Sequence, residues 1–247
     1  MKLLAWFDTI GLLQLRVWDF SFRSLLREYG RNFIWRVALR HPLRTWQGMN
    51  RYRTSQPCEA QPVAQSAWRN GQDAVVGVGF CLKPLHPPCP SGRANHDCAF
   101  FEKHLYQTDQ TVPPSCQNCT IRTIGQAALG AGNAFYIMTS AQDILFDLFL
   151  PALKTRRFTR CTVAICRYSY EPFALAASIA GLETHLFPYH SGDCKNYPTW
   201  RKADIGVKEE QTDIAPAEYA SLLSLLPPQP TLAENPIIKQ GHLFYPS

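Results

Sequence analysis

The chain has 247 residues, of which 46% are hydrophobic, so it can bury a sizeable core as one or two domains. Its nine cysteines fit either a disulfide scaffold or a metal site. The sequence contains no run of about 18 uncharged apolar residues that would predict a transmembrane helix, and Asp8 interrupts the apolar run that a signal peptide would need. We therefore expect a cytoplasmic protein whose cysteines are metal ligands or reactive thiols.

The net charge of +6 is concentrated in the N-terminal segment. Residues 1–53 carry ten Lys and Arg and three Asp and Glu, a balance of +7, whereas the remaining residues sum to −1. Apolar residues recur there at helical spacing, together with four of the six tryptophans, which predicts a basic amphipathic helical extension.

Three roles are open for this extension. We favour packing on the main domain. The alternatives are docking of a protein partner and peripheral contact with an anionic membrane surface at the inner membrane face. Nucleic acid is the least favoured partner, because no recognisable binding module accompanies the charge.

Changes in composition divide the remaining chain into three parts. Residues 54–72 are rich in Gln, Ser, Ala and Pro and predict a linker, in which Cys58 is a bystander. Residues 73–226 contain the predicted strands and helices of a cysteine-rich α/β domain. Residues 227–247 are rich in proline and predict an extended tail.

Short apolar runs alternate with helical patterns in the central domain, which is typical of an open, mostly parallel four-stranded sheet with covering helices. The carboxyl ends of parallel strands share one edge, where such sheets bind ligands. We expect strands at 74–80, 134–138, 161–165 and 183–187 and helices at 120–131, 140–153, 171–180 and 216–226.

Five cysteines are predicted to meet at this edge. Cys81, Cys166 and Cys194 follow the first, third and fourth strands, and Cys116 and Cys119 form a CxxC motif before the first helix. Two intervening residues let both thiolates face one metal. We therefore expect these five to be metal ligands. The helix N-terminus predicts a lowered pKa for Cys119.

Two more cysteines of the loop after the first strand, Cys89 and Cys98, are further candidates for cofactor binding. Cys161 stands at the start of a strand, on the wrong side of the sheet, so we interpret it as a buried structural residue. His86, His96 and His104 lie near the cysteines and could be ligands, but we expect these loop histidines to be solvated.

The ligand spacing favours an iron–sulfur cluster over zinc. A structural zinc site usually offers two tight ligand pairs, whereas this chain has a single CxxC and widely separated further cysteines. We expect a [4Fe–4S] cluster, with zinc as the alternative. A metal-free thiol oxidoreductase that uses Cys116 and Cys119 is the third hypothesis.

The order of these features resembles that of the bacterial and archaeal domain of unknown function number one hundred and sixteen, over about residues 74–200. The matching pieces are Phe80-Cys81-Leu82, Cys116-Gln117-Asn118-Cys119, Thr139-Ser140-Ala141, Val163-Ala164-Ile165-Cys166 and Gly192-Asp193-Cys194. The chain departs from the family pattern at Phe80, where a histidine is usual, and at Thr139-Ser140-Ala141, which replaces Gly-Gly-Ser. The resemblance implies an iron–sulfur or metal-binding role without a defined reaction.

The sequence thus predicts an iron–sulfur protein of redox chemistry, electron transfer or cofactor maturation, with a protein redox partner or client. If the protein is an enzyme, we expect an iron–sulfur-dependent oxidoreductase. The main alternative is a structural-zinc adaptor that docks a partner or a membrane through residues 1–53.

Overall fold

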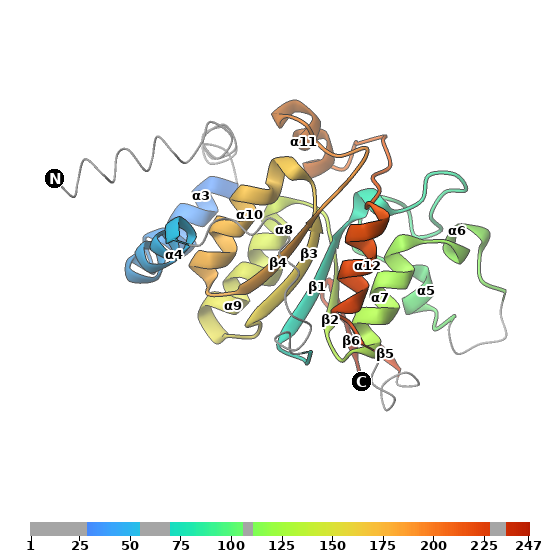
Figure 1. Ribbon diagram of the computed structural model, residues 1–247, viewed down its shortest axis with the longest axis horizontal. Helices are drawn as coiled ribbons and strands as arrows, with labels where there is room; N and C mark the ends of the chain where they lie inside the picture. The colour runs from blue at the N-terminus through green and yellow to red at the C-terminus, as the bar shows by residue number, and fades with distance from the viewer. Residues whose placement is uncertain (1–28, 55–69, 106–110, 228–235) are drawn as a thin grey trace.

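A six-stranded sheet forms the centre of the protein (Figure 1). The computed structural model describes residues 29–54, 70–105, 111–227 and 236–247. The strands are β1 (Ala74–Gly79), β2 (Ala134–Met138), β3 (Arg160–Ile165), β4 (Glu183–Pro188), β5 (Ile237–Gln240) and β6 (Leu243–Pro246). They lie in the order β4-β3-β1-β2-β6-β5, and β1 to β4 are parallel. The predicted α/β class with a mostly parallel sheet is confirmed, but the sheet has six strands rather than four.

The two additional strands come from residues 227–247, where we expected an extended tail. They form a hairpin that turns at Gly241, and β6 pairs antiparallel with β2. The side chain of Phe244 is fully buried and contacts the rings of Phe101 and Phe135. The first four prolines of this segment precede the hairpin, so they remove no hydrogen bond from its ladder.

Helices cover both faces of the sheet (Figure 1). Alternate strand residues point to opposite faces, so Val76 and Val78 belong to one hydrophobic core and Val75 to the other. The first core lies under α5 (Ala99–Glu102), α7 (Thr120–Gly130) and α12 (Pro216–Ser224), with α6 (Pro114–Gln117) just before α7. The second lies under α8 (Ala141–Ile144), the π-helical η3 (Leu145–Phe149), α9 (Leu150–Thr155) and α10 (Arg167–Ala180).

The N-terminal helices pack outside α10 (Figure 1). They are α3 (Tyr29–Phe33), the π-helical η1 (Ile34–Ala38) and α4 (Pro42–Thr54). Residues 1–28 of the predicted extension and most of the predicted linker, with Cys58, lie outside the described residues. Of the helices that the structure describes, none is both long enough and apolar enough to cross a membrane.

Three helical features differ from the expectation. The helix predicted at 140–153 is divided by the π-helical turn η3. Helix α10 begins at Arg167, four residues before the predicted start, and runs through Pro172. The short 3-10 turn η2 (Phe80–Leu82) and helix α11 (Tyr197–Asp204) follow β1 and β4 at the edge that carries the predicted site.

Candidate metal centre and adjoining pocket

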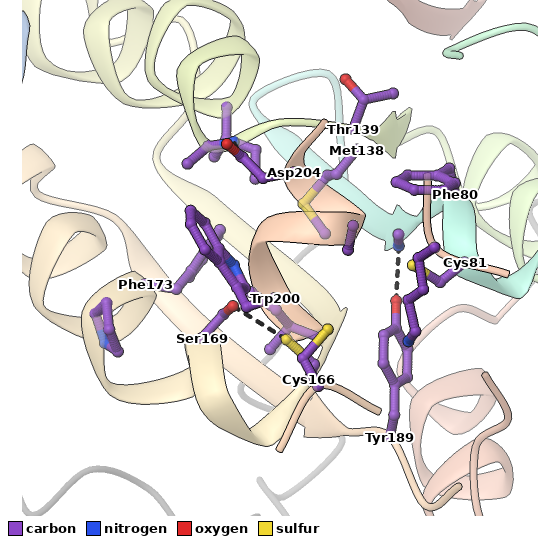
Figure 2. A pocket seen from close by; sticks show the side chains of 18 of the residues that line it. Phe80, Cys81, Met138, Thr139, Cys166, Ser169, Phe173, Tyr189, Trp200 and Asp204 are labelled. Carbon is purple, nitrogen blue, oxygen red and sulfur yellow. Dashed lines mark hydrogen bonds between the residues drawn. The ribbon is translucent and has the colours of Figure 1, made fainter. Parts of the chain in front are cut away.

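A pocket opens between the carboxyl ends of β1 and β3 (Figure 2). Helix α7 follows β1 on one face of the sheet and α10 follows β3 on the other, so the chain diverges at this point and leaves a crevice. The cavity measures about 90 Å³. Its walls include the side chains of Phe80, Met138, Phe173 and Trp200. The pocket is therefore mainly apolar and lies where parallel sheets bind ligands.

Tyr189, which lines this pocket, holds the two strands together. Its hydroxyl accepts a hydrogen bond from the backbone N–H of Gly79 (2.7 Å) and donates one to the carbonyl of Ala164 (2.7 Å). The side chain is buried, and a Cβ at residue 79 would lie 2.8 Å from the hydroxyl, so the close approach requires glycine there. The contact fixes the spacing of β1 and β3 where the pocket begins.

Three of the five predicted ligands line this pocket. Cys81 follows β1, Cys166 is the residue before α10, and Cys194 comes from the loop after β4. The thiols of Cys166 and Cys194 lie near each other, and each shifts the pKa of the other. Sequence reasoning therefore placed these three cysteines at a common edge, and the structure brings them together.

The surroundings of Cys166 favour its thiolate form. The Cys194 side chain lowers the pKa of Cys166 against the effect of burial. The hydroxyl of Ser169 lies 3.0 Å from the Cys166 sulfur, and the nearby Lys208 ammonium lowers the pKa further. The Cys166 side chain and burial raise the pKa of Cys194, which thereby keeps its proton.

The other four cysteines form a second set outside the pocket. Cys89 and Cys98 come from the loop after β1, Cys116 lies in α6, and Cys119 directly precedes α7. Burial raises the pKa of Cys98, and its neighbours Cys119 and Cys89 raise it further. Burial also raises the pKa of Cys116, and the same two neighbours raise it further. None of the eight cysteines that the structure describes is in a disulfide.

Backbone N–H groups favour the thiolate form of two cysteines of this set. Those of Phe100 and Phe101, at the start of α5, act to lower the pKa of Cys98. Those of Ile121 and Arg122, at the start of α7, act to lower the pKa of Cys119. N–H groups beside cysteine sulfurs are a common feature around metal-bound cysteines.

Two cations lie beside the four sulfurs. Lys83 is only 2% exposed, and its ammonium donates to the carbonyls of Gly92 (3.1 Å) and Asn95 (3.0 Å). Burial lowers the pKa of Lys83, whereas Cys89 and Cys98 would raise it as thiolates. Arg122 donates to the carbonyl of Cys116 (3.1 Å) and lowers the pKa of both Cys116 and Cys119. This positive charge offsets the charge of thiolates.

The predicted five-cysteine site is thus distributed over two places. Cys81, Cys166 and Cys194 line the pocket, whereas Cys116 and Cys119 belong with the two loop cysteines that we named as further candidates. The division arises because the long loop after β1 carries its cysteines toward α5 and α7, away from the ends of β3 and β4. No periodicity in the sequence indicates the path of that loop.

The expected lowering of the pKa of Cys119 is wrong. Burial raises the pKa of this thiol, and the N–H groups of α7 only partly counteract the effect. Cys161 lies in β3 with its sulfur 3.3 Å from the hydroxyl of Thr184 and is completely buried, as expected for a structural residue.

One of the three loop histidines is not solvated. The His96 side chain is 11% exposed, stacks on His242 with 3.9 Å between ring centroids, and lies 2.7 Å from the carbonyl of Ile137 through Nδ1. Asp147 accepts hydrogen bonds from the Tyr136 hydroxyl (2.8 Å) and lies 2.7 Å from Nδ1 of His242. His242 belongs to the hairpin turn, which sequence patterns did not reveal, so this cluster was missed.

The ligand atoms of His96, Asp147 and His242 lie within 4.8 Å of one another, and among the described residues they are the only such set of three. No three described cysteine sulfurs are therefore that close together.

Comparison of the chain with protein-family models, with curated proteins and with solved structures finds no match.

Proposed function

We propose that the protein binds an iron–sulfur cluster through Cys89, Cys98, Cys116 and Cys119 and acts in electron transfer or redox chemistry. The observation that carries the proposal is the grouping of four thiols beside backbone N–H donors and two cations. When bound, such a cluster supplies one-electron chemistry. The chain supplies the thiolates, the backbone N–H groups near Cys98 and Cys119 and the surrounding positive charge.

The contacts around these sulfurs suggest how the chain would tune the cluster. Hydrogen bonds to ligand sulfurs and nearby positive charge stabilise the more negative, reduced state. The charge of Lys83 is shielded from water and fixed in position, because the side chain is buried and backbone carbonyls hold its ammonium. We therefore expect Lys83 to raise the reduction potential of the site.

Anaerobic purification with iron, acid-labile sulfide and zinc analysis tests this proposal. We expect a coloured protein with iron and sulfide in matching amounts. The variants Cys98→Ser and Cys119→Ser are expected to lose most of the iron, whereas Cys161→Ser, at the buried structural cysteine of β3, retains it. A colourless protein with stoichiometric zinc would contradict the cluster and favour the zinc alternative.

A second candidate function is docking to an anionic membrane surface through the N-terminal helices. Between residues 29 and 54 the chain has six arginines and no acidic residue. Five large apolar side chains of this region are between 42% and 75% exposed, namely Ile34, Trp35, Leu39, Leu43 and Trp46. Exposed tryptophan and leucine beside arginine suit the boundary between headgroups and acyl chains.

Sedimentation with lipid vesicles tests this second function. We expect the protein to bind vesicles that contain anionic lipid and to bind neutral vesicles weakly. The double variant Trp35→Ser and Leu43→Ser should lose this binding. The matched control is Val207→Ser, which removes an exposed apolar residue (56%) outside the N-terminal helices. Equal binding by both variants would contradict the assignment of the surface.

A further inference from the structure

The pocket at the sheet edge contains a pair of cysteines that the proposed cluster does not use. Cys166 and Cys194 are 28 positions apart in the sequence, and their thiols lie near enough for each to shift the pKa of the other. Both residues line the cavity. Figure 2 shows the Cys166 sulfur next to a second sulfur atom and in a hydrogen bond with the hydroxyl of Ser169. Two thiols in contact need only a small movement to form a disulfide.

The pair is chemically asymmetric. Cys166 precedes the 14-residue helix α10, whose first N–H groups and dipole favour a thiolate. The hydroxyl of Ser169, 3.0 Å from the sulfur, and the ammonium of Lys208 act in the same direction. The neighbouring Cys166 sulfur raises the pKa of Cys194, which therefore retains its proton. Cys166 is thus suited to attack a substrate, and Cys194 to react second.

The cavity offers this pair a small, apolar substrate space. A buried water needs about 10–15 Å³ of such volume, so about 90 Å³ has room for a group of roughly six to nine heavy atoms. Phe80, Met138 and Trp200 contribute apolar walls. Near the sulfurs, Lys208 is held by the carbonyl of Gly192, so its charge stays beside the reacting atoms.

We propose that Cys166 and Cys194 carry out thiol–disulfide exchange with small apolar disulfides that enter this pocket. The Cys166 thiolate attacks one sulfur of the substrate, which forms a Cys166–substrate disulfide and breaks the substrate S–S bond. The leaving thiolate takes the proton of Cys194. The Cys194 thiolate then attacks the Cys166 sulfur, releases the second substrate thiolate and forms the Cys166–Cys194 disulfide.

Two electrons pass from the cysteine pair to the substrate disulfide in this sequence. One disulfide becomes a thiol and a thiolate, and the dithiol of the protein becomes a disulfide. A low-molecular-weight thiol of the compartment restores the pair by the same exchange in reverse. The reaction uses no atom of the four-cysteine site.

The experiment incubates the reduced full-length protein with diethyl disulfide and follows thiol release and disulfide mapping by mass spectrometry. With one equivalent of diethyl disulfide per chain, we expect two thiols released per chain and a bond between Cys166 and Cys194. Cys194→Ser should stop at one released thiol, with one substrate half attached to Cys166. Absence of the Cys166–Cys194 disulfide in the wild-type protein, or two thiols released by Cys194→Ser, would overturn the proposal.

A milder variant tests whether the surroundings of Cys166 stabilise its thiolate, without removing a sulfur atom. Ser169→Ala deletes a hydrogen bond to a charged atom, so we expect the formation of the mixed disulfide to slow by about tenfold or more. Thr184→Ala is the matched control, because it removes the hydroxyl beside Cys161 in β3 and should leave the rate unchanged. Equal rates in both variants, or faster reaction with oxidised glutathione than with diethyl disulfide, would contradict the assigned site or substrate class.

Discussion

Tyr189 is the side chain on which the shape of the pocket most directly depends. Its hydroxyl forms hydrogen bonds with Gly79 of β1 and with Ala164 of β3. Removal of the hydroxyl leaves one buried N–H and one buried carbonyl without this partner. We therefore expect Tyr189→Phe to lower the free energy of unfolding by about 1–3 kcal/mol, measured by urea denaturation.

Tyr219→Phe is a suitable control, because Tyr219 is only partly buried in α12. A change within about 0.5 kcal/mol is expected for it. If Tyr189→Phe were equally harmless, the hydroxyl would not contribute to strand spacing. The proposed formation of a disulfide between Cys166 and Cys194 should then also proceed unchanged in Tyr189→Phe.

His96 makes the stability of the protein depend on pH. Burial lowers the pKa of His96, and His242 lowers it further, while the hydrogen bond to Ile137 and the charge of Asp143 oppose this. The unfolded chain therefore takes up the proton first as the pH falls below about 6.5, and stability is lost from there downward. Burial lowers the pKa of His185 in the same direction.

We expect the free energy of unfolding to decrease as the pH falls from about 7 to about 5, and His96→Asn to weaken this dependence. Urea denaturation at several pH values measures both slopes. His190→Asn should keep the wild-type slope, because the His190 side chain is exposed to water in the folded protein. A steeper slope for His96→Asn would contradict the assignment.

Helix α4 packs closely on α10 through a glycine. A Cβ at Gly48 would lie 2.4 Å from the Cα of Ile179, so a side chain there forces the two helices apart. We expect Gly48→Ala to destabilise the protein by about 1–3 kcal/mol, measured by thermal and denaturant unfolding. The change should also weaken vesicle binding, because it displaces the helices that carry Trp35 and Leu43.

Gly130 is the matched control for this substitution. A Cβ there meets no other atom within 4 Å, so Gly130→Ala should be neutral or stabilise α7 by up to about 1 kcal/mol. Similar destabilisation by both substitutions would show that the contact between α4 and α10 is not the cause, because alanine has the higher helix propensity at both positions.

The C-terminal hairpin joins the sheet, the aromatic core and the cysteine loop into one body. Phe244 is buried against Phe101 and Phe135, and the Lys239 ammonium contacts Asp97 and Glu102 on either side of Cys98. We expect Phe244→Ala to cost about 3–5 kcal/mol of unfolding free energy and to lower the iron content at the four-cysteine site.

Ile238→Ala, on the exposed side of β5, should change stability by less than about 0.5 kcal/mol and leave the iron content unchanged. Denaturation curves and iron analysis on the same preparations compare the two variants. Loss of stability in Phe244→Ala with full retention of iron would mean that the hairpin and the cysteine loop fold separately.

Local sequence patterns were sufficient to predict the four parallel strands of the central α/β unit. The apolar runs at 74–80, 134–138, 161–165 and 183–187 match β1 to β4 within two residues, because a buried parallel strand needs a short continuous apolar run. The position of Cys81, Cys166 and Cys194 after strands was enough to place them at one edge, since parallel strands end together.

The remaining features depend on contacts between distant segments. The hairpin of β5 and β6 is four residues long on each side, and what stabilises it is the pairing of Leu243 and Phe244 with β2. The cysteine loop has no periodicity, so its cysteines are grouped by where α5, α6 and α7 pack. The sequence therefore determined the strands and the edge at which they end. Only the tertiary structure separated four cysteines beside α7 from three in a pocket, because burial and proximity are set by packing.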